Sequence, residues 1–194
     1  MLFSEDRLVR KDASYGSIEI ICGSMFSGKT EELIRRIRRA QMAKLGVQIF
    51  KPSLDIRYHE ETITSHDGNR IPSTSVDSSS AILLLTNGAK VIGIDEAQFF
   101  DDELPEICNQ LANNGTRVIA AGLDMDFKGR PFGPVPALMA IAEHVTKVHA
   151  VCAHCGAPAT YSYRIIEDDN RLLLGQKESY EPRCRACFYN GKKI

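Results

Sequence analysis

Short apolar runs rich in β-branched residues alternate along the chain with longer stretches that are apolar on one helical face. The runs predict buried strands at residues 17–22, 47–52, 90–95, 117–122 and 145–151. The amphipathic stretches predict helices at residues 30–46, 81–86, 104–113 and 134–144. Because strand and helix alternate to about residue 151, we expect an α/β fold whose mostly parallel sheet carries helices on both faces.

Three segments fall outside this alternation. Residues 1–16 show no sustained periodicity, which predicts a flexible lead-in. Residues 53–80 are polar and rich in Ser, Asp and His, which predicts one long loop. Residues 151–194 differ in composition from what precedes them and contain two cysteine pairs. We therefore expect a small second domain at 151–194 after an α/β domain at 17–150.

The composition limits the classes of partner. The chain has 194 residues, of which 43% are hydrophobic, enough to bury one sizeable core. Its 24 basic and 25 acidic side chains leave a net charge of -1, which gives no general attraction to nucleic acid or to an anionic membrane. The N-terminus is too charged for a secretory signal, and no apolar run approaches the roughly 20 residues of a membrane span. We expect a soluble cytoplasmic protein that binds neither nucleic acid nor membrane.

The segment GSMFSGKT fits the phosphate-loop pattern G-x-x-x-x-G-K-[ST] at every fixed position, between a predicted strand and a predicted helix. Glycines let the backbone curl so that N–H groups point at phosphate oxygens, and the start of the helix adds positive potential. In this pattern Lys29 reaches the β- and γ-phosphates, and the Thr30 hydroxyl is a ligand for Mg²⁺. The alternative is a chance glycine-rich turn. We predict a triphosphate site formed by Gly23, Ser24, Met25, Phe26, Ser27, Gly28, Lys29 and Thr30.

The apolar strand at residues 90–95 ends in acid, and the chain continues as Asp95, Glu96, Ala97 and Gln98. In a phosphate-loop fold, an acid at the end of a neighbouring strand stands beside the magnesium ion, which makes Asp95 the predicted Mg²⁺ partner. Glu96 could face the γ-phosphate and accept a proton from an attacking hydroxyl or water. A solvated acidic pair at a strand end is the alternative. We predict that these four residues complete the nucleotide site, with ATPase and kinase activity both open.

Two Cys-x-x-Cys pairs, Cys152 with Cys155 and Cys184 with Cys187, are separated by 28 residues. Four thiolates suit a tetrahedral Zn²⁺ ion, and four filled positions imply a closed, structural site. The intervening segment would then be a lasso, a long loop tied at its neck by the metal. Disulfides and a redox Cys-x-x-Cys are the alternatives, which suit a reducing compartment less well. Tyrosines in the loop could bind nucleic acid, or the loop could fold back over a small ligand.

Seven stretches carry a more specific signal: GSMFSGKTEEL, KPSLDIRY, SHDG, IDEAQFF, GLDMDFKGRPFG, VCAHCG and LLLGQKESYEPRCRAC. Together they resemble the cellular-type (type II) thymidine kinases, occur in that family's order, and span nearly all of residues 17–190. The resemblance implies a phosphate-loop α/β domain and a zinc-bound lasso domain that closes over the thymine base. It also implies a cytosolic homotetramer that serves deoxynucleoside salvage and is inhibited by thymidine triphosphate.

The resemblance also implies a mechanism and a set of site residues. In that family the glutamate matching Glu96 is the general base for the 5′-hydroxyl of thymidine, which then attacks the γ-phosphate of Mg-ATP. Positions near the thymine methyl match Met25, Leu123 and Tyr180, and the aromatic surround matches Phe99, Phe127 and Phe132. Lasso positions that bind the base through the main chain match Ser162, Leu174 and Gly175. The D-x-R-Y stretch matches Asp55 and Arg57, to which we assign no step.

Two other functions stay open on the residues alone. A nucleic-acid-dependent ATPase with a zinc ribbon would also use an acidic strand end, although the chain is short and has no net positive charge. It predicts ATP hydrolysis stimulated by single-stranded DNA without nucleoside transfer. A zinc-stapled nucleotide-binding module without catalysis predicts tight ATP binding and no product.

Overall fold

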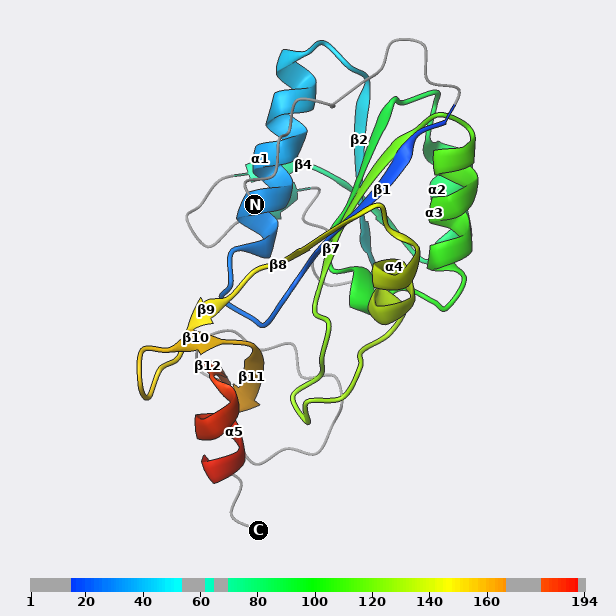
Figure 1. Cartoon of the computed structure of the whole chain (residues 1–194). Helices are drawn as coiled ribbons and strands as arrows, with labels where there is room; N and C mark the ends of the chain where they lie inside the picture. The colour runs from blue at the N-terminus through cyan, green and yellow to red at the C-terminus, as the bar shows by residue number, and fades with distance from the viewer. Residues whose placement is uncertain (1–14, 54–61, 65–69, 167–178, 192–194) are drawn as a thin grey trace.

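A computed structural model of the chain describes residues 15–53, 62–64, 70–166 and 179–191, and a six-stranded sheet lies at its centre (Figure 1). The strands lie in the order β5-β2-β6-β7-β1-β8, and every neighbouring pair is parallel. Their bounds are Ser17–Cys22 (β1), Val47–Pro52 (β2), Thr74–Val76 (β5), Val91–Ile94 (β6), Arg117–Gly122 (β7) and His144–Lys147 (β8). The predicted α/β fold with a parallel sheet is therefore confirmed.

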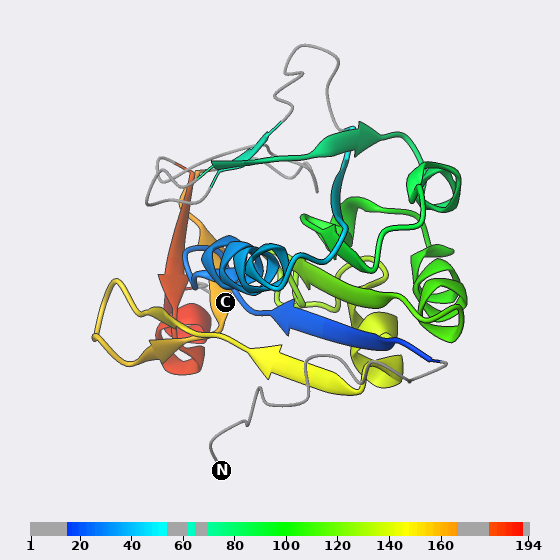
Figure 2. The same cartoon turned by 90° about the horizontal axis from the view of Figure 1, so that it is seen from above.

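Helices cover both faces of this sheet (Figure 2). On one face, α1 packs an apolar stripe that includes Leu33 and Ile37 into one cluster with Ile21 of β1. On the other face, α2, α3 and α4 share a second cluster with Ile20 and Ile94. The helix bounds are Lys29–Met42 (α1), Ser80–Leu85 (α2), Leu104–Asn113 (α3) and Val135–Ile141 (α4). Full burial of each large aliphatic side chain contributes about 1.5–3 kcal/mol, so these two clusters hold the layers together.

A buried ion-pair network fixes α1 against the sheet. The Glu19 carboxylate of β1 accepts from Arg36 of α1 at 2.7 Å and from Arg117 of β7 at 2.6 Å. Arg36 also pairs with Glu32 at 2.8 Å and donates to the Thr146 hydroxyl at 2.9 Å. Because a buried charge without a partner is strongly destabilising, each of these groups depends on the others. The network thereby sets the position of the helix that begins at the phosphate loop.

The end of α1 and the segment after β2 differ from the prediction. The helix ends at Met42 rather than at Gly46, because Lys44 adopts a left-handed φ of 59° and Leu45 N–H returns to the Ala40 carbonyl at 3.1 Å. Residues 53–80, predicted to be one loop, contain an antiparallel hairpin and the strand β5. The hairpin strands are Thr62–Thr64 (β3) and Arg70–Pro72 (β4). Strands of three residues are too short for their alternation to be recognised in a sequence.

The predicted strand at residues 145–151 is divided into two. β8 pairs with β1 and ends at Lys147, whereas Ala150–Val151 (β9) leaves the sheet and pairs with Pro158–Ala159 (β10). The sequence of the segment did not reveal this change of partner, because periodicity does not tell which strand a run will pair with. The last predicted helix is also shorter than residues 134–144, since α4 covers Val135–Ile141.

Together with β9 and β10, the remaining described elements form a small module beyond the carboxyl edge of the sheet (Figure 1). Tyr161–Arg164 (β11) pairs with Tyr180–Arg183 (β12), and helix Arg185–Gly191 (α5) packs beside them. The Tyr161 ring stacks on Phe188 of α5 with 4.3 Å between centroids. A domain boundary at residue 150 stays a prediction. None of the helices in the described part of the chain is both long enough and apolar enough to cross a membrane.

Candidate active site

The carboxyl ends of β1, β6 and β7 meet at one edge of the sheet. Cys22 at the end of β1 is in register with Gly122 of β7, and Ile94 at the end of β6 is in register with Ala120. Parallel strands present the segments that follow them at the same edge, where ligands of open α/β sheets bind. The phosphate-loop sequence, the acidic pair and the start of the GLDMDF segment therefore converge.

The phosphate-loop sequence joins β1 to α1, as the pattern predicts. Gly23 has a φ of 146°, and a Cβ atom there would lie 2.2 Å from the Val148 carbonyl oxygen, so that only glycine fits. Gly28 adopts a left-handed φ of 84° as the residue that precedes α1. The Ser24 carbonyl accepts from Ser27 Oγ and from Lys29 Nζ, both at 2.7 Å. The loop is therefore closed on itself by its own side chains and presents the start of α1 to the site.

Thr30 and Asp95 face each other across the loop. The Thr30 hydroxyl donates to Asp95 Oδ2 across 3.4 Å. Burial and the neighbouring Glu96 charge raise the pKa of Asp95 to about 7, and a divalent cation beside it would favour the charged carboxylate instead. Hydroxyl and carboxylate oxygens are the hard ligands that Mg²⁺ prefers. The two side chains predicted for magnesium are therefore adjacent and of a suitable kind.

Glu96 is an exposed carboxylate held in one orientation. Its backbone adopts a left-handed φ of 52°, a conformation that is uncommon for residues other than glycine and recurs at functional sites. Gln98, which is 2% exposed, donates from Nε2 to Glu96 Oε2 at 2.5 Å. The Gln98 Oε1 atom accepts from Leu123 N–H at 2.8 Å, which fixes the amide so that its NH₂ group must face Glu96. Gln98 thus orients Glu96 and ties it to the end of β7.

Lys29 lies among carboxylates at this edge. Burial lowers the pKa of Lys29, whereas the charges of Glu96, Asp95, Asp124 and Glu31 oppose that effect. These charges favour the protonated lysine, and the ammonium ion is the form that can bind a phosphate.

Sequence reasoning missed Asp124, a buried carboxylate just beyond β7. Its Oδ2 pairs with Lys147 Nζ of β8 at 2.6 Å, and its Oδ1 has no hydrogen-bond partner among the described residues. Since β1 lies between β7 and β8 in the sheet, this pair spans the strand that leads into the phosphate loop. The sequence pattern that pointed to Asp95, an acid shortly after an apolar strand, is also present at Asp124.

We expect Lys147→Met to destabilise the protein more than Asp124→Asn. The Asp124 side chain is 5% exposed and the Lys147 side chain 39%, so loss of the lysine leaves a buried charge whereas loss of the acid leaves a solvated one. A buried group left unpaired costs about 1–3 kcal/mol, and an exposed ion pair contributes less than about 1 kcal/mol. Urea unfolding of both variants and of the double variant measures the difference. Equal destabilisation by the two single changes would contradict this asymmetry.

The small module contacts the phosphate loop directly. The backbone N–H of Met25 donates to Ser162 Oγ of β11 at 3.0 Å, and Ser24 Oγ donates to the Ala159 carbonyl at 3.3 Å. Phe26 packs against a small apolar cluster that includes Cys152. Changes in the module can therefore reach the loop through two hydrogen bonds and one packed ring.

The described residues that the resemblance assigns to the nucleoside come from separate elements. Phe99 and Phe132 meet edge to face with 5.6 Å between ring centroids. The Arg164 guanidinium lies 3.6 Å from the centroid of the Phe127 ring, and Arg164 donates a hydrogen bond to the Tyr180 phenolic oxygen. The backbone N–H of Leu123 donates to Gln98 Oε1, and that of Met25 donates to Ser162 Oγ. The predicted residues Leu174, Gly175, Asp55 and Arg57 lie outside the described part of the chain.

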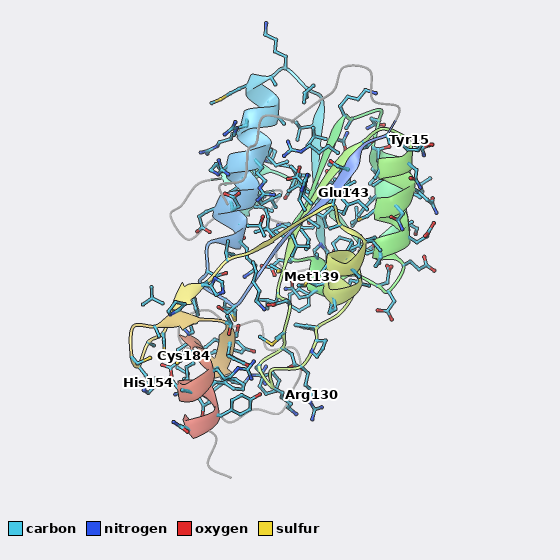
Figure 3. All side chains as sticks on the ribbon, viewed as in Figure 1. Tyr15, Arg130, Met139, Glu143, His154 and Cys184 are labelled. Atoms are coloured by element: carbon cyan, nitrogen blue, oxygen red, sulfur yellow. The ribbon has the colours of Figure 1, made fainter. Side chains whose placement is uncertain are left out.

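The four cysteines of the two Cys-x-x-Cys pairs lie together. Their sulfur atoms are all within 4.8 Å of one another, and Cys155 and Cys184 approach to 3.6 Å (Figure 3, where Cys184 and His154 are labelled). Burial opposes the Cys152 thiolate, but the backbone N–H groups of Cys184, Cys155 and His154 outweigh burial and lower its pKa to about 6. Such donors to sulfur are typical of metal-binding knuckles. The predicted cysteine cluster is confirmed, and it could hold a zinc ion.

Comparison with known proteins gives one consistent result. A sequence profile described as Thymidine kinase matches residues 16–188. The chain is 60% identical over 188 residues to a thymidine kinase of Bacteroides fragilis, covering 97% of this chain and 94% of that protein. It is 58% identical over 184 residues to a thymidine kinase of Rhodothermus sp., covering 95% of this chain and 86% of that protein. Domain III of the Thermotoga maritima replication initiation protein DnaA is a weak structural match, with a TM-score of 0.41, 16% identity, and coverage of 71% of this chain and 57% of that one.

Proposed function

This chain belongs to the thymidine kinase family, and on that premise we propose a complete reaction for it. The enzyme phosphorylates thymidine, as its family does. We infer that the acceptor is the 5′-hydroxyl, that ATP is the donor, and that Glu96 is the general base. The products are then thymidine monophosphate and ADP.

The orientation of Glu96 is the observation that carries this proposal. Its Oε2 atom is held by Gln98, and it directly follows Asp95, which faces Thr30 at the end of the phosphate loop. A general base must lie within hydrogen-bond reach of the proton that it takes, and a carboxylate with one oxygen fixed leaves the other to do so. The hydroxyl whose proton is taken would then approach the γ-phosphate from the side of Glu96.

The transfer itself is a displacement at phosphorus. The Glu96 carboxylate takes the proton of the 5′-hydroxyl, and the oxygen forms a bond to the γ-phosphorus. The bond from that phosphorus to the β–γ bridging oxygen breaks, and ADP leaves with its electron pair. The backbone N–H groups of the phosphate loop and the Lys29 ammonium stabilise the charge that accumulates on the phosphate oxygens.

Two metal ions complete the proposed enzyme. Thr30 and Asp95 would hold Mg²⁺, which neutralises part of the triphosphate charge when bound. Cys152, Cys155, Cys184 and Cys187 would hold a structural Zn²⁺, since four clustered thiolates leave no position open for a reactant. The zinc would tie β9 and β12 together at the neck of the module.

The proposed thymine pocket lies where the module meets the phosphate loop. Support comes from the hydrogen bond of Ser162 to Met25 and from the aromatic residues Phe99 and Phe132 near Gln98. Leu123, Phe127 and Tyr180 would complete the walls around the base. The main chain at Leu174 and Gly175 would bind the base edge, because an unpaired polar group in a closed pocket costs about 1–3 kcal/mol.

The family supports further proposals about assembly and control. We infer a cytoplasmic homotetramer in deoxynucleoside salvage, inhibited by thymidine triphosphate that occupies the thymidine pocket and the phosphate loop together. Sedimentation would give the assembly state directly. Inhibition that is relieved by raising thymidine would support occupation of the acceptor pocket.

A nucleoside panel tests the reaction. Purified protein with Mg-ATP is expected to convert thymidine to thymidine monophosphate, with one ADP formed per product, and to act much less on purine deoxynucleosides. Products are separated by ion-exchange chromatography. ATP hydrolysis without nucleoside product, stimulated by single-stranded DNA, would favour an ATPase instead, and ATP binding without any product would favour a non-catalytic module.

A further inference from the structure

Arg164, at the end of β11, is a buried arginine that no step of the proposed reaction uses. It is 8% exposed, and its guanidinium lies 3.6 Å from the centroid of the Phe127 ring. It also donates to the phenolic oxygen of Tyr180 from Nε at 3.1 Å and from Nη2 at 2.5 Å. Arg164 thereby joins an aromatic residue of the loop after β7 to one at the start of β12.

The geometry of this contact restrains both rings. A guanidinium is planar and always charged, and its N–H groups project in a fixed fork. Two donors on one phenolic oxygen set the direction of the Tyr180 hydroxyl, and hydrogen bonds from a charged donor are stronger than neutral ones. The face of the same guanidinium packs on Phe127 as a cation–π contact. One side chain therefore sets the spacing between Phe127 and Tyr180.

The loop that carries Phe127 is itself packed against the module. It runs from β7 towards β11, with Arg130 labelled near its outer end (Figures 1 and 3). Gly129 in this loop has a φ of 77°, and a Cβ atom there would lie 3.2 Å from Tyr161 and 3.3 Å from Phe188. The close approach leaves little room for the loop to shift. Phe127 is therefore a fixed support for Arg164.

We propose that Arg164 is a positioning residue that determines how well the enzyme distinguishes thymine from a base without the 5-methyl group. The inference rests on the proposed thymine pocket, in which Phe127 and Tyr180 are walls. A single methyl group gives discrimination of about 10–200-fold at most, and a wall that can relax gives less. By holding Tyr180 through its hydroxyl, Arg164 keeps that wall from moving when the methyl group is absent.

The test compares thymidine with deoxyuridine, which lacks only the methyl group. Arg164→Met is expected to lower kcat/KM for thymidine by about tenfold, the rate effect of about 1.4 kcal/mol. We expect it to lower kcat/KM for deoxyuridine much less and to leave the KM for ATP nearly unchanged. The ratio of the two kcat/KM values should therefore fall several-fold. Tyr180→Phe, which removes the acceptor of the fork, should lower the ratio by a similar factor.

A double variant tests whether Arg164 acts through Tyr180. If it does, kcat/KM for thymidine in the double variant Arg164→Met with Tyr180→Phe is expected to be no lower than in the more impaired single variant, because both changes remove the same contact. If the losses in kcat/KM of the two single variants multiply in the double variant, the proposal is overturned. An unchanged ratio in Arg164→Met would overturn it as well.

Arg183 offers a matched control in the same module. It is also 8% exposed and lies 3.4 Å from the centroid of the Tyr163 ring, but its polar contacts are with Glu181 and the Cys187 carbonyl. Arg183→Met should disturb packing of the module without changing the ratio of thymidine to deoxyuridine. An equal fall of the ratio in Arg183→Met would show that general loosening explains the effect, and would overturn the assignment to Arg164.

Tyr180→Ala separates this inference from the pocket on which it rests. If Tyr180→Ala leaves the kinetics with thymidine unchanged, the proposed pocket is wrong and this inference falls with it. If Tyr180→Ala is impaired and Arg164→Met is not, the pocket stands and the role of Arg164 is wrong.

Discussion

Replacement of Glu96 by glutamine is expected to lower kcat for thymidine phosphorylation by about 10²–10⁴-fold, the contribution of a general base. The substitution keeps the shape of the side chain, and the amide oxygen can still accept from Gln98 Nε2. It removes the basic oxygen that would take the proton of the 5′-hydroxyl. ATP binding should be nearly unchanged, because the phosphate loop and Lys29 remain. Steady-state kinetics and calorimetric titration with ATP measure the two quantities separately.

Glu106→Gln provides the matched control for this prediction. Glu106 is an exposed carboxylate on α3, and the substitution removes the same charge without touching the candidate site. Its kcat should match that of the unmodified enzyme. Retained turnover in Glu96→Gln would mean that another group takes the proton. Loss of ATP binding in Glu96→Gln would mean that the carboxylate acts on the donor site instead.

Removal of zinc is expected to raise the KM for thymidine about tenfold or more while changing the KM for ATP much less. The cysteine cluster joins β9 to β12, and β11 beside β12 carries Ser162, which contacts the phosphate loop at Met25. Structural zinc sites contribute on the order of 10 kcal/mol to the folding of the segments that they join. Loss of the two hydrogen bonds proposed from the main chain at Leu174 and Gly175 to the thymine base, at about 0.5–1.5 kcal/mol each, already accounts for a tenfold change in the KM for thymidine.

A pyridine-based chelator that binds zinc and leaves magnesium in place makes this measurement specific. Metal analysis before treatment should give one zinc per chain, and activity should return when zinc is added back. Unchanged thermal unfolding in Cys184→Ser would contradict a structural metal. An equal rise of both KM values would show that the module does not act on the acceptor alone.

Local patterns in the sequence predicted much of the core of the fold. The strands β1, β2 and β7 and the helix α3 have the predicted bounds, because each strand is a short, mainly apolar run and the helix has a clear apolar stripe. Prediction was wrong where an element is very short, as in β3, β4 and β5. It was also wrong for the end of α1, because Lys44 adopts a left-handed conformation and the helix ends before Gly46, where the sequence predicted its end.

The sequence by itself determined the parts of the site that depend on neighbours along the chain. These are the phosphate loop, the acid at the end of β6 and the two cysteine pairs, because a fixed spacing on one element sets their geometry. The resemblance added the roles of Glu96 and of the residues around the base.

Only the tertiary structure decided which distant groups meet. It placed β7 between β6 and β1, and thereby brought Asp124 beside the phosphate loop. It also paired Met25 with Ser162, 137 residues apart, and set Gln98 between Glu96 and Leu123. Such contacts depend on strand order and register, which the period of a single strand does not specify. For that reason the sequence predicted Glu96 as a base, whereas the orientation of Glu96 and the position of Arg164 came from the fold.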